Sequence, residues 1–355
     1  MNQLQKYVAL LDGQGVEGFL LTSQTNRFYA ASYDVAEGVA VVTAKGSWYF
    51  TDSRYIEAAQ KHLDGFEVVM TDMEHPFELL INQVIESAGI KILGIEEQYL
   101  SLMEYNAYKE KLHAELKFCQ SALSGLRDVK EPWELDVMRQ AQAITDAAFA
   151  AILPCIREGM TEKELRAELI YKLYQLGAEN MAFDPIVVAG PNSSLPHGVP
   201  TDRKIQKGDF ITMDFGAKFG GYCADMTRTV ALGYATDEMK KVYHTVFEAQ
   251  KAGIAVSKAG VLGKTVHEAA AKVIADAGYG PYFGHGYGHG LGIEVHESPS
   301  CNLRGLTPMP VGAACSAEPG IYLPDKFGVR IEDVVFFTED GCEDITKSPK
   351  ELIIL

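Results

Sequence analysis

The first third of the chain alternates between short apolar runs and longer segments with helical spacing. Runs rich in β-branched and aromatic residues, each bounded by polar or turn-forming residues, are expected to form strands over residues 16–21, 39–42, 48–50, 66–70 and 91–95. The segments between them are expected to be helical, as over residues 55–62 and 76–87. Residues 1–127 are therefore predicted to form an α/β domain.

A long amphipathic helix is expected to begin near residue 131, after the pattern loosens over residues 121–125. Pro132 falls in the first turn, where proline is tolerated. Apolar residues then recur at helical spacing: Leu135, Met138, Ala141, Ala148 and Ile152. Because 355 residues exceed what one hydrophobic core usually serves, we expect two domains, residues 1–127 and residues 128–355.

The second domain contains a faint internal repeat. A Thr-x-x-Glu capping signature occurs at Thr161 and again at Thr265, and each copy follows a long predicted helix, over residues 133–157 and 236–258. Each copy is also followed by a predicted strand pair, residues 209–215 with 222–232 and residues 314–322 with 328–338. Two halves with the same order of helices and strands predict an α+β domain with pseudo-two-fold symmetry.

The composition narrows the class of partners. Asp and Glu number 48 against 32 Lys and Arg, which gives a formal net charge of −16. This charge repels phosphate groups, so we expect neither nucleic acid nor a membrane as a partner. The chain begins without a basic leader and an apolar run, and no segment approaches the roughly 18 apolar residues of a membrane span. With six scattered cysteines and no Cys-x-x-Cys pair, these features predict a cytoplasmic protein.

Both predicted strand pairs of the second domain carry acids at positions where buried residues are expected. Asp214 lies on the first strand of one pair, and Asp225 shares a face with Thr227 on the second strand by period-two alternation. Glu318 and Glu332 occupy the corresponding places in the other pair. One such acid is usually at an edge or a turn, but four in equivalent places are expected to converge. Because packed carboxylates cost several kcal/mol each without compensation, a pair of divalent cations is the simplest explanation.

A segment rich in histidine and glycine lies between the two predicted strand pairs in the sequence. Residues 284–299 have glycine at every second position of their first half, which lets the backbone approach a crowded centre closely. The segment contains three of the nine histidines of the chain, His285, His289 and His296. Each histidine alone fits a structural role as well as a functional one. Beside four acids, at least one is expected to bind a metal.

Five motifs follow one another along the second domain: Asp-Phe-Gly, Gly-Tyr-x-Ala-Asp-Met-Thr-Arg-Thr, Gly-His-Gly-x-Gly, Glu-Pro-Gly-Ile-Tyr and Val-Arg-Ile-Glu-Asp. In type and order they resemble the motifs of the metal-dependent pita-bread peptidases of family M24, in particular the Xaa-Pro dipeptidase (prolidase) and Xaa-Pro aminopeptidase branch. The resemblance covers the whole chain. It implies a creatinase-type N-terminal domain over residues 1–127 and a pita-bread catalytic domain over residues 128–355.

This resemblance implies a site with two divalent metal ions. Asp214 is expected to bind one metal, Asp225 and Glu332 to bridge both, and His289 with Glu318 to complete the second. Four carboxylates and one imidazole form an oxygen-rich ligand set, for which Mn²⁺ is the first candidate and Co²⁺, Fe²⁺ and Zn²⁺ are others.

The resemblance also implies hydrolysis of the Xaa-Pro bond in short peptides. A hydroxide between the two metals attacks, and Glu318 serves as general acid and base. Three histidines are implied to face the substrate: His197, His285 and His296. His197 and His296 are also expected to support the tetrahedral intermediate, while Arg330 and Thr227 steady the carboxylates from behind. The family further implies a homodimer.

One departure from the family pattern bears on specificity. Some prolidases carry an arginine after the His-Glu-Ser-Pro position that anchors the free carboxylate of a dipeptide, whereas Ser300 stands here and Arg304 is out of register. Dipeptidase and aminopeptidase action therefore both stay open. Two further alternatives are a catalytically inactive pita-bread module that binds peptides or proteins and a creatinase-like hydrolase. The complete ligand set disfavours both, because creatinases do not retain it.

Overall fold

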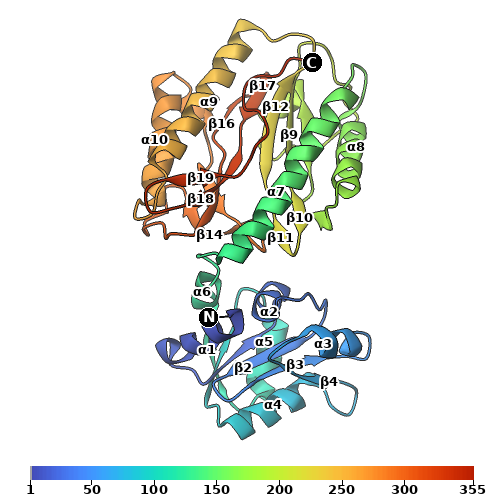
Figure 1. The fold of residues 1–355 in the computed structure, drawn as a ribbon, viewed down its shortest axis with the longest axis vertical. Coiled ribbons are helices and arrows are strands. Elements are labelled where there is room, and N and C mark those ends of the chain that lie inside the picture. Colours follow the sequence, from blue (N-terminus) through green and yellow to red (C-terminus); the bar gives the residue numbers. More distant parts are fainter. Residues whose placement is uncertain (1) are drawn as a thin grey trace. The chain divides into compact units, whose positions relative to one another are not determined.

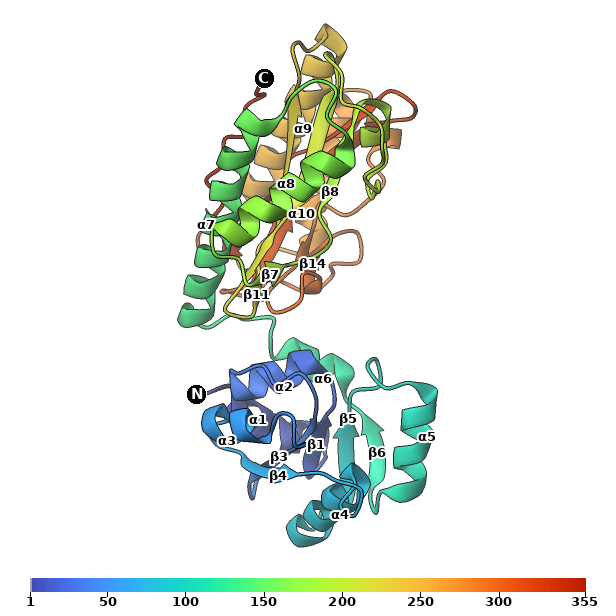
Figure 2. The same ribbon diagram turned by 90° about the vertical axis from the view of Figure 1, so that its right-hand side faces the viewer.

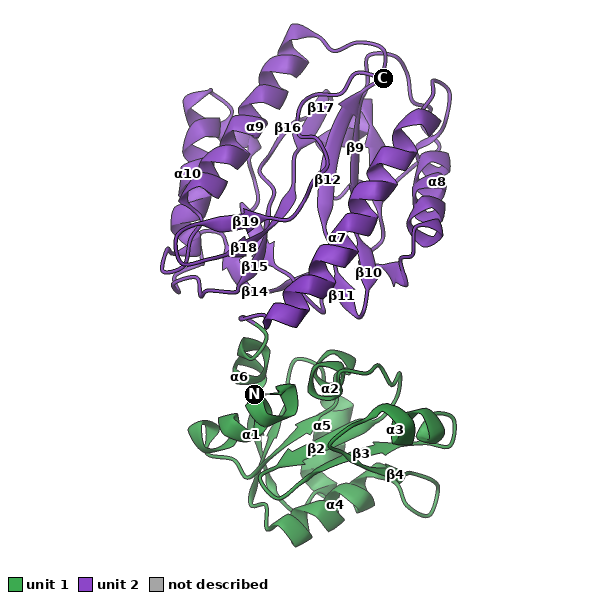
Figure 3. Cartoon of the chain, in the orientation of Figure 1, with its two compact units in different colours: residues 1–127 green, residues 128–355 purple. Residues whose placement is uncertain are grey.

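The computed structural model describes residues 2–355, and the chain divides into two compact units, Met1–Arg127 and Asp128–Leu355 (Figure 3). Each unit has its own sheet and hydrophobic core. None of the helices in the described residues combines the length and the apolar composition that crossing a bilayer requires.

The first unit is built on a six-stranded mixed sheet with the strand order β4-β3-β2-β1-β5-β6. Its elements are α1 (Gln3–Gln14), β1 (Gly18–Leu21), α2 (Gln24–Ala31), β2 (Val39–Thr43), β3 (Ser47–Thr51), α3 (Ile56–His62), β4 (Glu67–Met70), α4 (Phe77–Ala88), β5 (Ile92–Ile95), α5 (Leu102–Lys111), β6 (Glu115–Phe118) and α6 (Gln120–Gly125). All five strands predicted from the sequence are present, with ends moved by one or two residues. The central strand β1 runs antiparallel to β2 and parallel to β5.

The second unit places two pairs of helices around several small sheets. Its helices are α7 (Pro132–Ile152), α8 (Glu162–Gln175), α9 (Asp237–Val256) and α10 (Gly263–Asp276). Its strands are β7 (Asn180–Met181), β8 (Ile186–Ala189), β9 (Phe210–Phe215), β10 (Ala217–Phe219), β11 (Tyr222–Cys223), β12 (Met226–Ala231), β13 (Gly288–Gly290), β14 (Glu297–Cys301), β15 (Ala314–Ala317), β16 (Gly320–Leu323), β17 (Phe327–Arg330), β18 (Asp333–Phe337) and β19 (Cys342–Asp344).

The helices of the second unit flank its strands on two sides. In Figure 1 the strands lie between the pair α9 and α10 and the pair α7 and α8, and Figure 2 shows α8 packed in front of β8. Two clusters of buried apolar side chains follow this division, one under α7 and α8 and one under α9 and α10. Each half has a helix pair followed by antiparallel strands, as the internal repeat predicted.

The two helix starts of the repeat differ. The Thr161 hydroxyl accepts a hydrogen bond from the backbone N–H of Glu164, and the Glu164 side chain completes the predicted capping box. The prediction at Thr265 is wrong, because α10 already begins at Gly263. At this end the backbone N–H of Lys264 donates to the carbonyl of Gly305, so a neighbouring loop takes the place of a side-chain cap.

Three of the four predicted strands that carry the acids are interrupted at the acid. The strand predicted over residues 222–232 is split into β11 and β12, and Asp225 lies in the gap, so it does not share a strand face with Thr227 as expected. In the other half, β15 pairs with β18 and β16 pairs with β17, which leaves Glu318 and Glu332 in the two gaps. The pairing of the segments is therefore as predicted, but three of the four acids lie between strands.

Candidate metal centre

Five side chains from separate segments of the second unit meet at one cavity of about 390 Å³. They are the five predicted ligands, Asp214, Asp225, His289, Glu318 and Glu332. Asp214 lies on β9 and His289 on β13, while the other three lie in gaps between strands. A residue in such a gap can turn its side chain away from the alternating faces of the sheet, which allows carboxylates from separate hairpins to point at one centre.

The ligand atoms of this set lie close together. Atom Nε2 of His289 is 3.2 Å from Oε1 of Glu318 and 3.5 Å from Oδ2 of Asp225. Asp225, His289 and Glu332 each offer a ligand atom, and these three atoms all lie within 4.8 Å of one another. Carboxylate oxygens and imidazole nitrogens at such separations can bind the same cation.

Two oxygen atoms of this centre have no hydrogen-bond partner in the part of the chain that the structure describes. They are Oδ1 of Asp214 and Oδ1 of Asp225, and both are buried. A buried, unpartnered carboxylate oxygen is costly, because it has lost its hydration without gaining a donor. A bound divalent cation would satisfy both oxygens, so the residues present fit a metal site.

The electrostatics of the centre also favour a cation. Burial raises the pKa of Asp225 well above its ordinary value, and repulsion from Glu332 and Asp214 raises it further. Burial raises the pKa of Glu332 in the same way, with Glu318 adding to the effect. Without a bound cation these carboxyl groups therefore favour the protonated form, and a divalent cation would favour the charged form instead.

The ring of His289 presents a free lone pair to the carboxylates. Its Nδ1 lies 3.1 Å from the carbonyl oxygen of Gly290, which only a protonated Nδ1 can bind. Burial lowers the pKa of His289, so the neutral tautomer with an unprotonated Nε2 is favoured. That nitrogen faces Asp225 and Glu318 and is the atom that could bind a metal.

Arg330 and Thr227 hold the carboxylates from behind. Arg330 donates through Nη2 to Oδ2 of Asp214 at 2.6 Å and through Nε to the Thr227 hydroxyl at 2.9 Å. The Thr227 hydroxyl in turn donates to Oε2 of Glu332 at 2.7 Å. All four side chains are buried or nearly so. Two of the predicted ligands are thus oriented by one guanidinium group.

The three histidines predicted to face substrate all line the cavity, but in different ways. His197 and His296 are exposed at its mouth, and the His296 ring lies edge-on to that of His289 with centroids 4.4 Å apart. His285 has both ring nitrogens engaged, with Nδ1 at 2.8 Å from the Gly286 carbonyl and Nε2 at 2.9 Å from the hydroxyl of Tyr322. His285 is therefore held by the protein, whereas the other two are open to a ligand.

Some residues at the centre were not singled out from the sequence. Tyr322 accepts a hydrogen bond from Arg330 at 2.8 Å and so joins it to His285. The Ser316 hydroxyl accepts from the backbone N–H of His289 and donates to Oε1 of Glu318, both at 3.0 Å. Tyr322 ends the Glu-Pro-Gly-Ile-Tyr motif and Ser316 lies two residues before Glu318, so both could have been found from their position next to a predicted ligand. No motif of the sequence pointed to the apolar lining residues Phe183 and Ile186.

Comparison with known proteins gives the family of the chain. Residues 136–339, more than half of the chain, match the model of metallopeptidase family M24, and residues 3–129 match the creatinase/prolidase N-terminal domain. The chain belongs to metallopeptidase family M24. As an M24 member it is a metallopeptidase, and the family implies divalent metal ions.

Relatives of the chain share both domains. The Xaa-Pro dipeptidase of Pyrococcus furiosus is 33% identical over 353 residues, which cover 99% of each chain. The solved structure of the Xaa-Pro dipeptidase from Bacillus anthracis matches with a TM-score of 0.96 and 40% identity, covering 99% of each chain. That of the X-Pro aminopeptidase from Thermotoga maritima matches with a TM-score of 0.91 and 35% identity, over 97% of this chain and 99% of the other. The predicted combination of a creatinase-type N-terminal domain and a pita-bread catalytic domain is confirmed.

Proposed function

We propose that this M24 chain hydrolyses the Xaa-Pro bond of short peptides with two divalent metal ions. The observation that carries the proposal is one cavity lined by four carboxylates and an imidazole, in which two buried carboxylate oxygens have no partner among the described residues. Relatives that match over nearly the whole chain bear the names Xaa-Pro dipeptidase and X-Pro aminopeptidase. The proposed ligands are Asp214, Asp225, His289, Glu318 and Glu332.

The chemistry that the metals supply when bound is Lewis acidity, which lowers the pKa of an attacking water and polarises the scissile carbonyl. The protein residues bind and orient this centre. Asp225 and Glu332 are the carboxylates proposed to be shared by the two ions, and each offers a ligand atom within 4.8 Å of one on His289. Arg330 binds Oδ2 of Asp214 and leaves Oδ1 for a cation. The oxygen-rich donor set favours Mn²⁺, and Co²⁺, Fe²⁺ and Zn²⁺ are alternatives.

Glu318 is the proposed proton carrier. Burial raises its pKa, so the carboxyl group can hold a proton nearer to neutral pH than an exposed glutamate can. The Ser316 hydroxyl is bonded to Oε1, and this contact fixes the plane of the carboxyl group. In the proposed reaction Glu318 takes a proton from the attacking water and passes it to the leaving proline nitrogen.

His197 and His296 are the proposed substrate contacts. Both are exposed at the mouth of the cavity, and burial of part of its ring lowers the pKa of His296, so the ring is neutral near neutral pH. A neutral imidazole N–H can donate to a substrate carbonyl or to the oxygen that becomes charged as the carbonyl is attacked. His285 completes the wall of the pocket beside Tyr322.

The preference for proline has a physical reason. An Xaa-Pro bond is a tertiary amide without an N–H, so enzymes that bind the scissile segment as a strand handle it poorly. A site that works on the carbonyl and the leaving nitrogen does not need that N–H. The apolar side chains of Phe183, Ile186 and Val295 line the same cavity and can pack against a pyrrolidine ring.

Two substrate lengths remain candidates, and Ser300 is the residue that favours the longer one. Ser300 stands where some prolidases carry a carboxylate-binding arginine, so a free carboxylate directly after proline has no matching cation at this position. Aminopeptidase action on longer Xaa-Pro peptides is therefore proposed beside dipeptidase action. A cytoplasmic homodimer is the proposed physiological form, in keeping with six free cysteines.

The test is to remove the metals by chelation and to restore Mn²⁺, Co²⁺ or Zn²⁺ separately. Release of the N-terminal residue is then compared for an Xaa-Pro dipeptide and an Xaa-Pro-Xaa tripeptide. Turnover that returns only with metal supports the proposal, and the ratio of the two rates decides between dipeptidase and aminopeptidase. Failure of every metal to restore turnover of either peptide would overturn it and favour a binding module without catalysis.

A further inference from the structure

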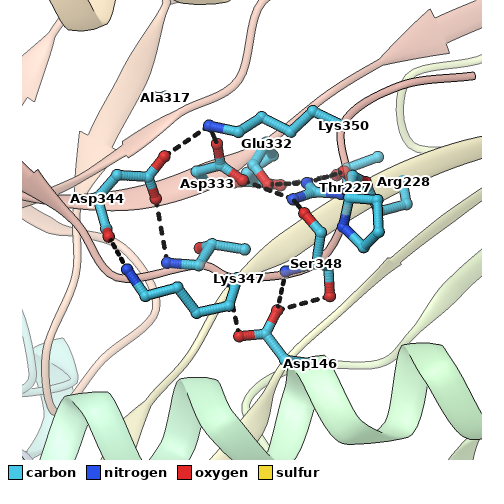
Figure 4. Close-up of polar contacts among 12 residues, drawn as sticks. Asp146, Thr227, Arg228, Ala317, Glu332, Asp333, Asp344, Lys347, Ser348 and Lys350 are labelled. Atoms are coloured by element: carbon cyan, nitrogen blue, oxygen red, sulfur yellow. Dashed lines mark hydrogen bonds and ion pairs between the residues drawn. The ribbon is translucent and has the colours of Figure 1, made fainter.

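A buried ion network lies directly behind the proposed metal ligand Glu332 (Figure 4). Its centre is Arg228 on β12, whose side chain is 1% exposed, paired with Asp333 on β18, whose side chain is fully buried. Neither residue lines the cavity. Burying charges is costly, so such a network calls for an explanation beyond stability alone.

Arg228 joins the two backbone segments that present the Glu332 carboxylate. Its Nη1 donates to the carbonyl of Glu332 at 2.6 Å and to the carbonyl of Thr227 at 3.0 Å. The Thr227 carbonyl also accepts the backbone N–H of Glu332 at 3.0 Å. Glu332 lies in the gap between β17 and β18, outside the strand ladder, so these contacts hold its backbone where pairing between strands does not.

Asp333 connects Arg228 to the C-terminal segment of the chain, residues 345–355. Its Oδ1 accepts from Nη2 of Arg228 at 2.7 Å, and its Oδ2 accepts from Gln250 at 2.9 Å and from Lys350 at 2.5 Å. Nζ of Lys350 also contacts Oδ2 of Asp344 at 2.5 Å. Figure 4 shows Lys350 reaching from the C-terminal segment to both carboxylates.

The same guanidinium group binds that segment through its backbone. Arg228 donates through Nη2 to the Ser348 carbonyl at 2.8 Å and through Nε to the Pro349 carbonyl at 2.9 Å. With the bonds to Thr227, Glu332 and Asp333, these contacts use all five N–H donors of the side chain. One residue therefore ties the C-terminal segment to the backbone of a proposed ligand.

We propose that Lys350, Asp333 and Arg228 act as positioning residues that set the geometry of Glu332, so that the C-terminal segment contributes to metal affinity. The inference rests on the proposed function, since it takes Glu332 as a metal ligand. Hydrogen bonds and ion pairs to residues that bind a metal orient these ligands, and their removal typically changes the metal affinity about 10–100-fold.

The experiment compares two lysines of the same segment in the full-length chain. Lys350→Met removes the contact to Asp333 and leaves Asp333 with Arg228 and Gln250, while Lys347→Met is the matched control. Lys347 is exposed, and its Nζ contacts only the Asp344 carbonyl in the described structure. Binding of Mn²⁺ to the metal-free proteins is measured by titration calorimetry, and folding is checked by the urea midpoint of the metal-free state.

We expect Lys350→Met to weaken Mn²⁺ binding by about tenfold, Lys347→Met to change it less than twofold, and Lys350→Arg to restore it. An affinity for Mn²⁺ in Lys350→Met equal to that of the control, even with a lower urea midpoint, would overturn the inference and leave the network purely structural. If Lys350→Met does not fold, Asp344→Asn weakens the hold on Lys350 more mildly and is measured in its place. Absence of Mn²⁺ binding in the unmodified chain would instead overturn the proposed function.

Discussion

The hydroxyl of Thr227 donates a 2.7 Å hydrogen bond to Oε2 of Glu332. The same hydroxyl accepts from Nε of Arg330, so its proton can point only at the glutamate. The bond fixes the orientation of the Glu332 carboxylate and leaves Oε1 and the second lone pair of Oε2 for the proposed cations.

Replacing Thr227 by valine should weaken metal binding while the shape of the side chain is kept. The expected change is a 10–100-fold lower affinity for Mn²⁺, because Glu332 loses the contact that orients it. Titration calorimetry on the metal-free protein measures this change. Thr229→Val is the matched control, since Thr229 lies on the same strand and is equally buried but bonds to Thr212 and the Arg330 carbonyl. Equal affinities in the two variants would contradict the role of Thr227.

Replacing Asp225 by asparagine should abolish hydrolysis. Asparagine keeps the size of the side chain but loses the charge that two cations would share. We therefore expect the metal content to fall and kcat/KM to drop by more than about a hundredfold, which exceeds the effect of removing a residue that only orients a metal ligand. Elemental analysis and peptide hydrolysis measure the two effects. The control is Asp209→Asn, which removes a carboxylate bonded to Arg203 outside the cavity. At a temperature where this variant is folded, its metal content and kcat/KM should stay within about twofold of the unmodified chain. Full activity in Asp225→Asn would refute the proposed ligand set.

Metal binding should release protons near neutral pH. Burial and mutual repulsion raise the pKa of Asp225 and Glu332 in the metal-free chain, so both carboxyl groups tend to hold protons that a cation must displace. The apparent affinity for Mn²⁺ should therefore fall as the pH is lowered. Calorimetry in two buffers of different ionisation enthalpy counts the protons released, and no difference between the buffers would contradict the prediction.

The same pKa shifts set the pH dependence of the metal-free protein. A carboxyl group with a raised pKa in the folded state stabilises that state fully below its unfolded pKa of about 4, and this contribution is lost as the pH rises through the folded-state pKa. Urea midpoints of the metal-free chain should thus decline toward neutral pH, and Asp225→Asn should flatten the decline. A parallel decline in the variant would show that other groups cause it.

Gly216 should not tolerate a side chain. A Cβ atom at this position would lie 1.8 Å from the carbonyl oxygen of Ala224, where the chain passes next to the gap that holds Asp225. Gly216→Ala is expected to lower the free energy of unfolding by about 1–3 kcal/mol, because the backbone must shift. Urea denaturation measures this loss. Gly341→Ala, where a Cβ would have no neighbour within 4 Å, should change the value little.

The sequence predicted the elements well where the signal is local. Strands of the first unit follow from short apolar runs, and the Thr161 capping box follows from residues within one turn. The four acids were singled out because a buried carboxylate is costly wherever it occurs. In these cases the prediction depends on residues close together in the sequence or on the cost of burying a single charged side chain.

The interruptions of the strands could not be predicted in the same way. Alternation shows that residues 314–322 and 328–338 are extended, but it does not show that β15 and β16 pair with different partners. The contact between Lys350 and Asp333 and the bond between Arg228 and Pro349 also depend on segments distant in the sequence. The start of α10 at Gly263 was missed because its cap comes from Gly305.

The gaps that hold Glu318 and Glu332 determine where the chain can change its length. Residues 324–326 form an exposed turn between β16 and β17, with Asp325 in the left-handed region at φ 59°, and an inserted residue there would project into solvent. A residue inserted beside Glu318 or Glu332 would instead shift one hydrogen-bonded hairpin against the other and move a proposed ligand off the centre. Insertions and deletions in M24 chains should accordingly be common at the turn and rare at the two gaps, a pattern that alignment of homologous sequences can test.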